Sequence, residues 1–169
     1  MKLSMKLSMK QISTIFLQVV VIFIGIGALA FLLWEPHVEG RNVHATLFEI
    51  YFKDPFLAYA YLGSTPFFAT LYQTFKLIGY ARQDRAISST AVSAVRMIRY
   101  CAVAIVCFVA VGEIFILTSN SDDHAPGVAM GVVISFGSIV IAAVAVVVEG
   151  VLQRALAWLP TTEKSTPGV

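Results

Sequence analysis

A single carboxylate within the apolar part of the chain is the first candidate for chemistry. Glu113 is the only acid inside a predicted membrane span and lies about 6 Å below its outer interface. A carboxylate in lipid is costly and often marks an ion or proton path. Tyr59, Tyr61 and Thr65 lie at similar depth on another predicted helix and could hydrogen-bond to it. Because Glu113 is shallow, we favour a role in joining two helices, with ion or proton coupling as the alternative.

Two glutamines and a proline are further polar or irregular points within the predicted spans. Gln18 and Gln73 lie at equal depth, so their amides could pair across two helices as structural glue. Pro66 lacks a backbone N–H and should kink its helix, and a hydroxyl of Ser64 or Thr65 could satisfy the freed carbonyl. The kink could shape a ligand cavity, although a purely structural proline is the favoured interpretation.

The sequence shows no arrangement typical of an enzyme or a cofactor site. Cys101 and Cys107 are six residues apart on a predicted helix and face different sides, which excludes a Cys-x-x-Cys redox centre. All histidines lie outside the predicted spans, which excludes a haem held by two intramembrane histidines. His37, Glu39 and His44 could touch one metal ion, but without close spacing we favour a solvated loop. We therefore predict no enzyme activity, no cofactor and no metal site.

The composition places these residues in a membrane protein. Of 169 residues, 58% are hydrophobic and 13% are charged, and the mean hydropathy of +0.81 lies outside the range of soluble domains. Four stretches are long enough to cross about 30 Å of hydrocarbon as helices, at about 12–34, 56–80, 97–117 and 127–148. The alternating pattern of barrel strands is absent from the sequence. We predict an all-α integral membrane protein folded as a four-helix antiparallel transmembrane bundle.

This single domain is predicted to cover residues 1–160, with residues 161–169 as a disordered cytoplasmic tail. A cleaved signal peptide is an alternative for the first span, because Ala28-Leu29-Ala30 resembles a cleavage site. The apolar run continues to Trp34, which is longer than a signal needs, so we favour an uncleaved anchor.

The distribution of Lys and Arg predicts the orientation. With the N-terminus in the cytoplasm, ten of the twelve basic residues lie on the cytoplasmic side, and Arg41 and Lys53 lie on the other. The positive-inside rule favours this arrangement, with both termini cytoplasmic. The composition predicts the lipid bilayer as a partner and does not favour direct nucleic acid binding.

The predicted fourth span carries small residues at steps of four and three on one face, which favours close helix packing. These residues are Gly127, Gly131, Ser135, Ser138, Ala142 and Ala145. The neighbouring helix could belong to the same chain or to a second copy in a homo-oligomer. The row ends at Glu149, which lies level with Lys76 and could form an ion pair with it.

The connector before the third span could form a basic surface. Ser88 or Ser89 could cap a helix there. Apolar residues at helical spacing predict a segment that lies along the inner leaflet before the span begins: Ala91, Val92, Val95 and Ile98. Four arginines would then form a basic platform for lipid or for an acidic protein surface: Arg82, Arg85, Arg96 and Arg99. The simpler interpretation is that they only hold the connector inside.

Several short segments from Phe56 onward carry a family resemblance. They are Thr65-Pro66-Phe67-Phe68, Leu71–Ile78, Ile98–Ala102, Asp122-Asp123 with Ala125–Val128, Phe136–Ala142 and Val151-Leu152-Gln153. Through them the chain resembles a bacterial family of small four-span membrane proteins, domain of unknown function 2975 (YoaS-like). The resemblance implies no established activity; it implies the inner membrane and, because members are found beside small helix-turn-helix regulators, a cytoplasmic regulatory partner. His124 interrupts the acidic-Ala-Pro-Gly pattern of the family.

Two hypotheses for function follow. The first is a non-enzymatic membrane protein that senses the state of the membrane or anchors a cytoplasmic regulatory partner. The second is a small transporter or channel subunit that uses Glu113 and the kink at Pro66. A polar cavity at the midplane would favour the second hypothesis, and a packed, dry bundle would favour the first.

Overall fold

The described part of the chain is entirely helical. A computed structural model describes residues 2–38, 55–83, 85–118 and 125–159. In these ranges it contains four helices: α1 (Lys2–Val38), α3 (Pro55–Arg82), α4 (Ser89–Thr118) and α5 (Ala125–Trp158). Each of the four predicted ranges falls within one of these helices.

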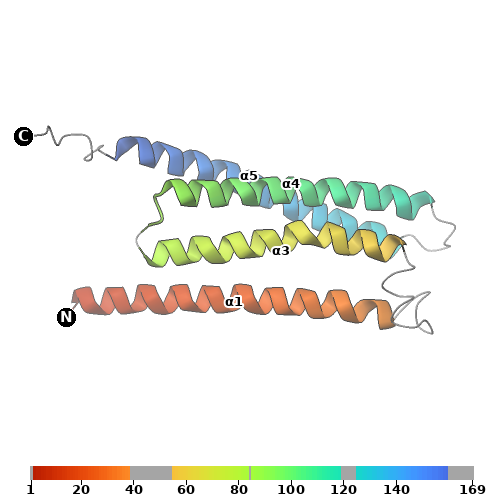
Figure 1. Ribbon diagram of the computed structural model, residues 1–169, viewed down its shortest axis with the longest axis horizontal. Helices are drawn as coiled ribbons and strands as arrows, with labels where there is room; N and C mark the ends of the chain where they lie inside the picture. Colours follow the sequence, from red (N-terminus) through yellow and green to blue (C-terminus); the bar gives the residue numbers. More distant parts are fainter. Residues whose placement is uncertain (1, 39–54, 84, 119–124, 160–169) are drawn as a thin grey trace, which may run out of the picture.

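The helices run antiparallel and pack in chain order (Figure 1). Contacts are most extensive between α4 and α5, fewer between α3 and α4, and fewest between α1 and α3. In the described part of the chain, extensive contacts therefore join only consecutive helices, as in an open row whose two end helices are α1 and α5. Helix α1 begins and helix α5 ends at the same end of the molecule (Figure 1).

Three of the helices are long and apolar enough to cross a membrane. These candidate spans are Gln11–Trp34, Ser89–Thr118 and Ala125–Trp158. Helix α3 is more polar, and two of its hydroxyls bond within the helix: Thr70 Oγ1 donates to the carbonyl of Pro66 and Thr74 Oγ1 to that of Thr70, both at 2.9 Å. Such bonds satisfy polar side chains where water is absent. The fourth span and the cytoplasmic location of both termini stay predictions.

The helices that contain the last two predicted spans are longer than those spans. Helix α4 has 30 residues and α5 has 34, which corresponds to about 45 and 51 Å against about 30 Å of hydrocarbon. Helix α4 starts eight residues before the predicted span, where the backbone N–H of Ala91 donates to Ser88 Oγ at 3.1 Å. Ser88 is thus the predicted helix cap. We infer that the end of the α4–α5 pair near Ser88 extends through the headgroup region.

The predicted segment along the inner leaflet is wrong. Ala91, Val92 and Val95 are buried between helices, and Ala91 is only 1% exposed. The same helical spacing that suggested an apolar face toward lipid places these side chains against neighbouring helices instead. Ala94 and Ala102 complete this densely packed region. Burial of apolar surface stabilises a protein more in contact with water than within lipid, so this packing suits the headgroup level inferred above.

Helix α1 has the opposite character. Large apolar side chains are exposed along it, among them Phe16, Phe23 and Trp34. In a bilayer such a surface contacts acyl chains, so exposure here is expected. Among the described residues, the extensive contacts of helix α1 are with α3, where Tyr61 Oη donates to the carbonyl of Leu32 at 3.3 Å.

Candidate functional site

A buried carboxylate between two arginines joins α4 and α5. Glu149 of α5 is 5% exposed. Its Oε1 lies 2.8 Å from Arg96 Nε, and its Oε2 lies 3.0 Å from Arg99 Nη1. Arg96 and Arg99 are one helical turn apart on α4, so both guanidinium groups reach the same acid from one face of that helix.

Helix α5 itself adds a third contact to this carboxylate. Gln153 Nε2 donates to Glu149 Oε1 at 3.2 Å, one turn further along the helix. The contact between Arg99 and Oε2 has ion-pair distance but not the alignment of a hydrogen bond. A carboxylate buried without partners would be strongly destabilising, so the two arginines are what makes this position tolerable for Glu149.

The arginines keep donors for other partners. The side chain of Arg96 is 48% exposed and that of Arg99 is 28% exposed. A guanidinium has five N–H donors, and Glu149 accepts one hydrogen bond from Arg96 and forms an ion pair with Arg99. The Arg99 guanidinium also lies 5.0 Å from the ring centroid of Tyr100, a cation–π contact that helps to fix its orientation. With two cations and one anion, the cluster carries a net positive charge.

The expected ion pair between Glu149 and Lys76 is not formed. Lys76 lies on α3, and its Nζ is 5.3 Å from the ring centroid of Tyr72 on the same helix. Helix α3 packs on α4, whereas Glu149 faces α4 from α5. Equal depth in the membrane did not mean adjacency, because α4 lies between the two residues.

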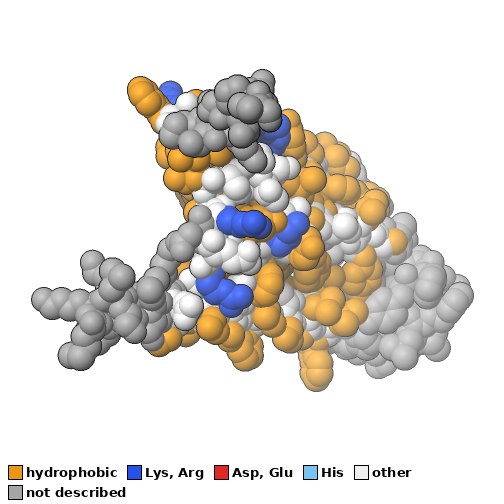
Figure 2. Space-filling model, turned by 60° about the vertical axis from the view of Figure 1, so that its left-hand side comes forward, with side chains coloured by type: hydrophobic (Ala, Val, Ile, Leu, Met, Phe, Trp, Pro, Cys, Tyr) orange, Lys and Arg blue, Asp and Glu red, His pale blue; other side chains and the backbone are white. Residues whose placement is uncertain are grey.

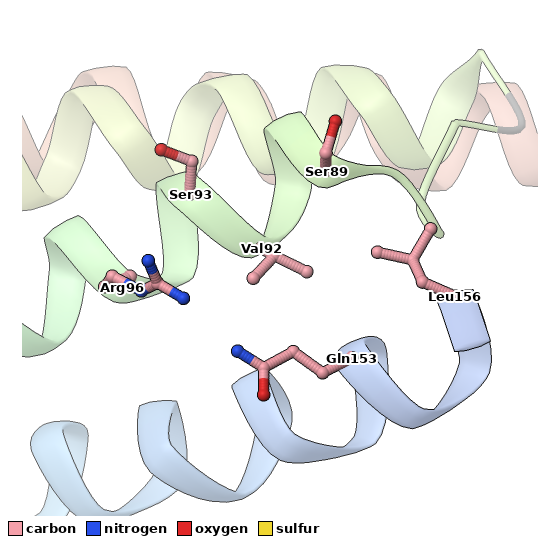
Figure 3. A pocket seen from close by; sticks show the side chains of 6 residues that line it. All are labelled: Ser89, Val92, Ser93, Arg96, Gln153 and Leu156. Carbon is pink, nitrogen blue, oxygen red and sulfur yellow. The ribbon is translucent and has the colours of Figure 1, made fainter.

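A hollow opens beside the cluster (Figure 3). It has a volume of about 330 Å³ and is lined by Ser89, Val92, Ser93 and Arg96 of α4 and by Gln153 and Leu156 of α5. The terminal nitrogens of Arg96 and the methyl groups of Val92 point toward its centre from α4, and Gln153 approaches from α5 (Figure 3). The hollow can accept a polar or anionic group.

Glu113 lies against α5 rather than α3. A Cβ atom built on Gly131 would overlap Oε1 of Glu113 and lie 2.7 Å from its Cδ. Two of the expected partners donate elsewhere: Tyr59 Oη to the carbonyl of Phe108 at 2.5 Å, and Thr65 Oγ1 to that of Tyr61 at 3.4 Å. Tyr61 donates to α1, as described above. The expected group of Glu113 with Tyr59, Tyr61 and Thr65 is therefore wrong, because the carboxylate uses the space left by a missing side chain on α5.

The small-residue face of α5 packs on α4 of the same chain. Four residues at steps of seven, seven and four are buried along it: Gly131, Ser138, Ala145 and Glu149. Gly127 lies beside Ile116, and Ser135 and Ala142 are half-buried. Of the two neighbours left open by the sequence, the structure places a helix of the same chain here.

The remaining candidates in the spans make mainly structural contacts. Gln18 Nε2 donates to the backbone carbonyl of Phe75 at 3.4 Å, so it joins α1 to α3 without using the amide of Gln73. Helix α3 continues through Pro66, and Ser64 Oγ donates to the carbonyl of Tyr61 at 2.8 Å. Cys101 is buried and Cys107 is exposed, both as free thiols.

Candidate metal ligands are not grouped in the part of the chain that the structure describes. The loop residues Glu39 and His44 lie outside the described residues, as do His124 and the tail 161–169, and the side chain of His37 is not described either.

The predicted basic platform divides into two parts. Arg96 and Arg99 are engaged with Glu149, whereas Arg82 and Arg85 are exposed at the turn between α3 and α4. Figure 2 shows Lys and Arg side chains gathered at the end of the molecule where α1 begins and α5 ends. The backbone N–H of Arg85 donates to the carbonyl of Tyr80 at 2.9 Å, so this turn is held by hydrogen bonds.

Sequence reasoning missed the cluster of Arg96, Arg99 and Glu149. A usable signal was present: two arginines one turn apart at the start of one span, and an acid at the end of the next span. Consecutive antiparallel helices bring such positions to the same level. The pairing of Glu113 with Gly131 fixes the same register further along the two helices.

Comparison with known proteins identifies relatives of this chain. The family model described as "Protein of unknown function (DUF2975)" matches residues 41–160. An "Uncharacterized membrane protein YoaS" of Bacillus subtilis (strain 168) is 40% identical over 153 residues, which cover 88% of this chain and 94% of the relative. No solved structure matches the chain.

Proposed function

The chain belongs to the DUF2975 family of membrane proteins of unknown function, and on that premise we propose that it anchors a cytoplasmic regulatory partner. The partner docks on the docking turn, which we define as residues 82–88 with Arg82 and Arg85 exposed. The proposal includes a location in the bacterial inner membrane with both termini cytoplasmic. It assigns no enzyme activity.

One observation carries this proposal. Arg82 and Arg85 are exposed on a hydrogen-bonded turn, while Glu149, the described acid at the same end, is buried and already paired. The side chains of this turn that the structure describes therefore carry positive charge, and the backbone N–H groups of Gln83 and Arg85 hold the described part of the turn by hydrogen bonds. Preorganised positive charge favours fast and specific association with an acidic protein surface.

The proposed orientation of the chain in the membrane follows from the distribution of its basic residues. If the docking turn were outside, the positive-inside bias of ten to two would be reversed, which is strongly disfavoured during insertion. Helix α1 starts and helix α5 ends at the same end of the molecule, which supports an even number of membrane crossings (Figure 1).

The experiment is cross-linking in native membranes, followed by identification of the proteins attached. Arg82→Gln with Arg85→Gln removes both positive charges of the docking turn, whose remaining charged residue is Asp84, and leaves Arg96, Arg99 and Lys76 to maintain orientation. Lys10→Gln with Arg154→Gln is the matched control, because it removes the same charge from the same predicted side. We expect a cross-linked soluble protein with wild type and control, and its loss with the double variant at the turn.

Two results would contradict the proposal. If topology and every partner interaction survive the double change, the arginines serve only to hold the connector inside. The same conclusion applies if the control variant loses the partner equally, because the effect would then depend on total charge and not on the docking turn.

Transport remains the second candidate because of one feature. Glu113 is a half-buried carboxylate in the seam between α4 and α5, within a candidate membrane span. Neither hollow that the structure shows between α4 and α5 is lined by Glu113 or Pro66. This favours anchoring over transport.

A further inference from the structure

A second hollow continues the first one along the α4–α5 seam. Its volume is about 400 Å³, and its lining includes Arg99, Val103 and Cys107 of α4 and Ile139, Ala143 and Val146 of α5. The polar hollow ends at Arg96 and this apolar hollow begins at Arg99, one turn further along α4. Residues three or four apart lie on the same face of a helix, so the two hollows open on the same side of the seam.

The two hollows lie end to end along the seam, and we call them together the lipid groove; the residues that line them become less polar toward the centre of the spans. Two serines, a glutamine and Arg96 line the end near the start of α4 together with Val92 and Leu156, and mainly aliphatic side chains line the part toward the centre of the spans. From Arg99 to Cys107 the groove follows about 12 Å of helix, close to the roughly 15 Å of hydrocarbon in one leaflet. This order and length match one phospholipid standing in its leaflet.

We propose that the lipid groove holds one anionic phospholipid from the leaflet at the arginine end. The free N–H donors of Arg96 and Arg99 bind the phosphodiester. Ser89, Ser93 and Gln153 surround the polar headgroup, and an acyl chain lies between Val103 and Ala143. Basic sites between membrane helices at the cytoplasmic side are known to bind anionic headgroups.

Charge complementarity selects this occupant. Two arginines face one glutamate, so one positive charge is left for an anionic lipid such as phosphatidylglycerol, whereas phosphatidylcholine carries no net charge. Glu149 acts here as a positioning residue, because it holds both guanidinium groups at the edge of the groove. A bare apolar groove of this size does not persist in a bilayer, where acyl chains are always in contact with it. The site does not depend on the docking role proposed above.

The test is native mass spectrometry of the purified full-length chain, released from detergent after titration with lipid. We expect one phosphatidylglycerol per chain, bound at least about fivefold more tightly than phosphatidylcholine, the effect of a single basic contact. An excess of inorganic phosphate should leave the lipid bound. Equal retention of both lipids, or displacement by phosphate alone, would overturn the proposal.

Two variants address the two ends of the lipid groove without removing the arginines. Ser93→Asp places a negative charge in the polar hollow, with Thr90→Asp as an exposed control on the same turn of α4. Ala143→Trp fills the apolar hollow, with Val144→Trp as a control at the same depth but pointing away from it. We expect each groove variant to weaken phosphatidylglycerol binding at least about fivefold and each control to leave it unchanged.

Other occupants would give different results. If Ala143→Trp alters the oligomeric state and not lipid retention, the groove is an interface between copies of the chain. If groove and control variants behave alike, lipid binds nonspecifically around the helices. Either result contradicts the proposed site.

Discussion

The carboxylate of Glu113 on α4 lies in the space that a side chain at Gly131 on α5 would occupy. The two residues are therefore one packing unit. Glu113 can lie in the seam because position 131 has no Cβ, and α5 can approach α4 because the group that fills the gap is the flexible end of a long side chain.

This relationship predicts that the effect of Gly131→Ala on stability depends on whether Glu113 is present, which a double-mutant cycle measures. Gly131→Ala should destabilise the wild-type chain by about 1 kcal/mol, because Glu113 must move and Val109 Cγ1 would lie only 3.2 Å from the new methyl group. In a Glu113→Ala background the same change should be neutral or stabilising, since alanine is the better helix former. Thermal unfolding in detergent measures both effects. If Gly131→Ala changes stability equally in the wild-type and Glu113→Ala backgrounds, the two residues do not share this space.

Glu113→Gln separates packing from coupling. The amide has nearly the same shape but cannot carry a proton or bind a cation as a carboxylate does. We expect the variant to complement a deletion strain as the wild type does, with normal amounts in the membrane. Loss of complementation with intact folding would support ion or proton coupling and the transport hypothesis.

The ion-pair cluster should contribute to stability through its buried member. Glu149→Ala leaves two arginines facing each other, and we expect the midpoint of thermal unfolding to fall by about 5 °C or more. Glu149→Gln should cost less, because the amide oxygen can still accept from Arg96 and Gln153. The reverse order of the two variants would mean that the hydrogen bonds accepted at this position do not contribute to stability.

Raising the salt concentration provides a second measurement on the same variants. Because Glu149 is buried, the difference between wild type and Glu149→Ala should change little between low and high salt. A difference that disappears in high salt would indicate a solvated pair that contributes little.

The start of α4 depends on one hydroxyl. Ser88→Ala removes the acceptor of the Ala91 N–H and should lower the free energy of unfolding by about 1 kcal/mol. Ser89→Ala is the control, since Ser89 is exposed and lies within the first turn rather than at the cap. Equal effects of the two changes would show that the cap is not the cause.

The helices themselves and the cap at Ser88 were predictable, whereas the extension of α5 to Trp158 was not. Runs of about twenty apolar residues are sufficient to locate membrane helices, because unpaired backbone groups cannot remain in lipid. The predicted third span began later than α4 and the predicted fourth span ended earlier than α5, because Arg96, Arg99 and Glu149 look like residues that leave the membrane. They pair with one another, so both helices continue past them.

The sequence predicted the level of each candidate residue along its helix, but not which neighbouring helix its side chain would face. Sequence spacing gives the level of Glu113, Glu149 and Lys76 along their helices, yet the rotation of each helix and the order of neighbours decide which groups touch. The open row, with α4 between α3 and α5, separates Lys76 from Glu149. The small residues of α5 did indicate a close approach, and Gly131 is where that approach includes a carboxylate.

A docking role requires Arg82 and Arg85 to face the cytoplasm, and cysteine labelling in spheroplasts tests this most directly. In a chain with Cys101→Ala and Cys107→Ala, Ala86→Cys reports on the docking turn and Thr118→Cys on the opposite end of α4; both positions are exposed. We predict that a membrane-impermeant maleimide labels Thr118→Cys in intact spheroplasts and labels Ala86→Cys only after permeabilisation. Labelling of Ala86→Cys in intact spheroplasts would place the arginines outside and contradict the proposed anchoring function.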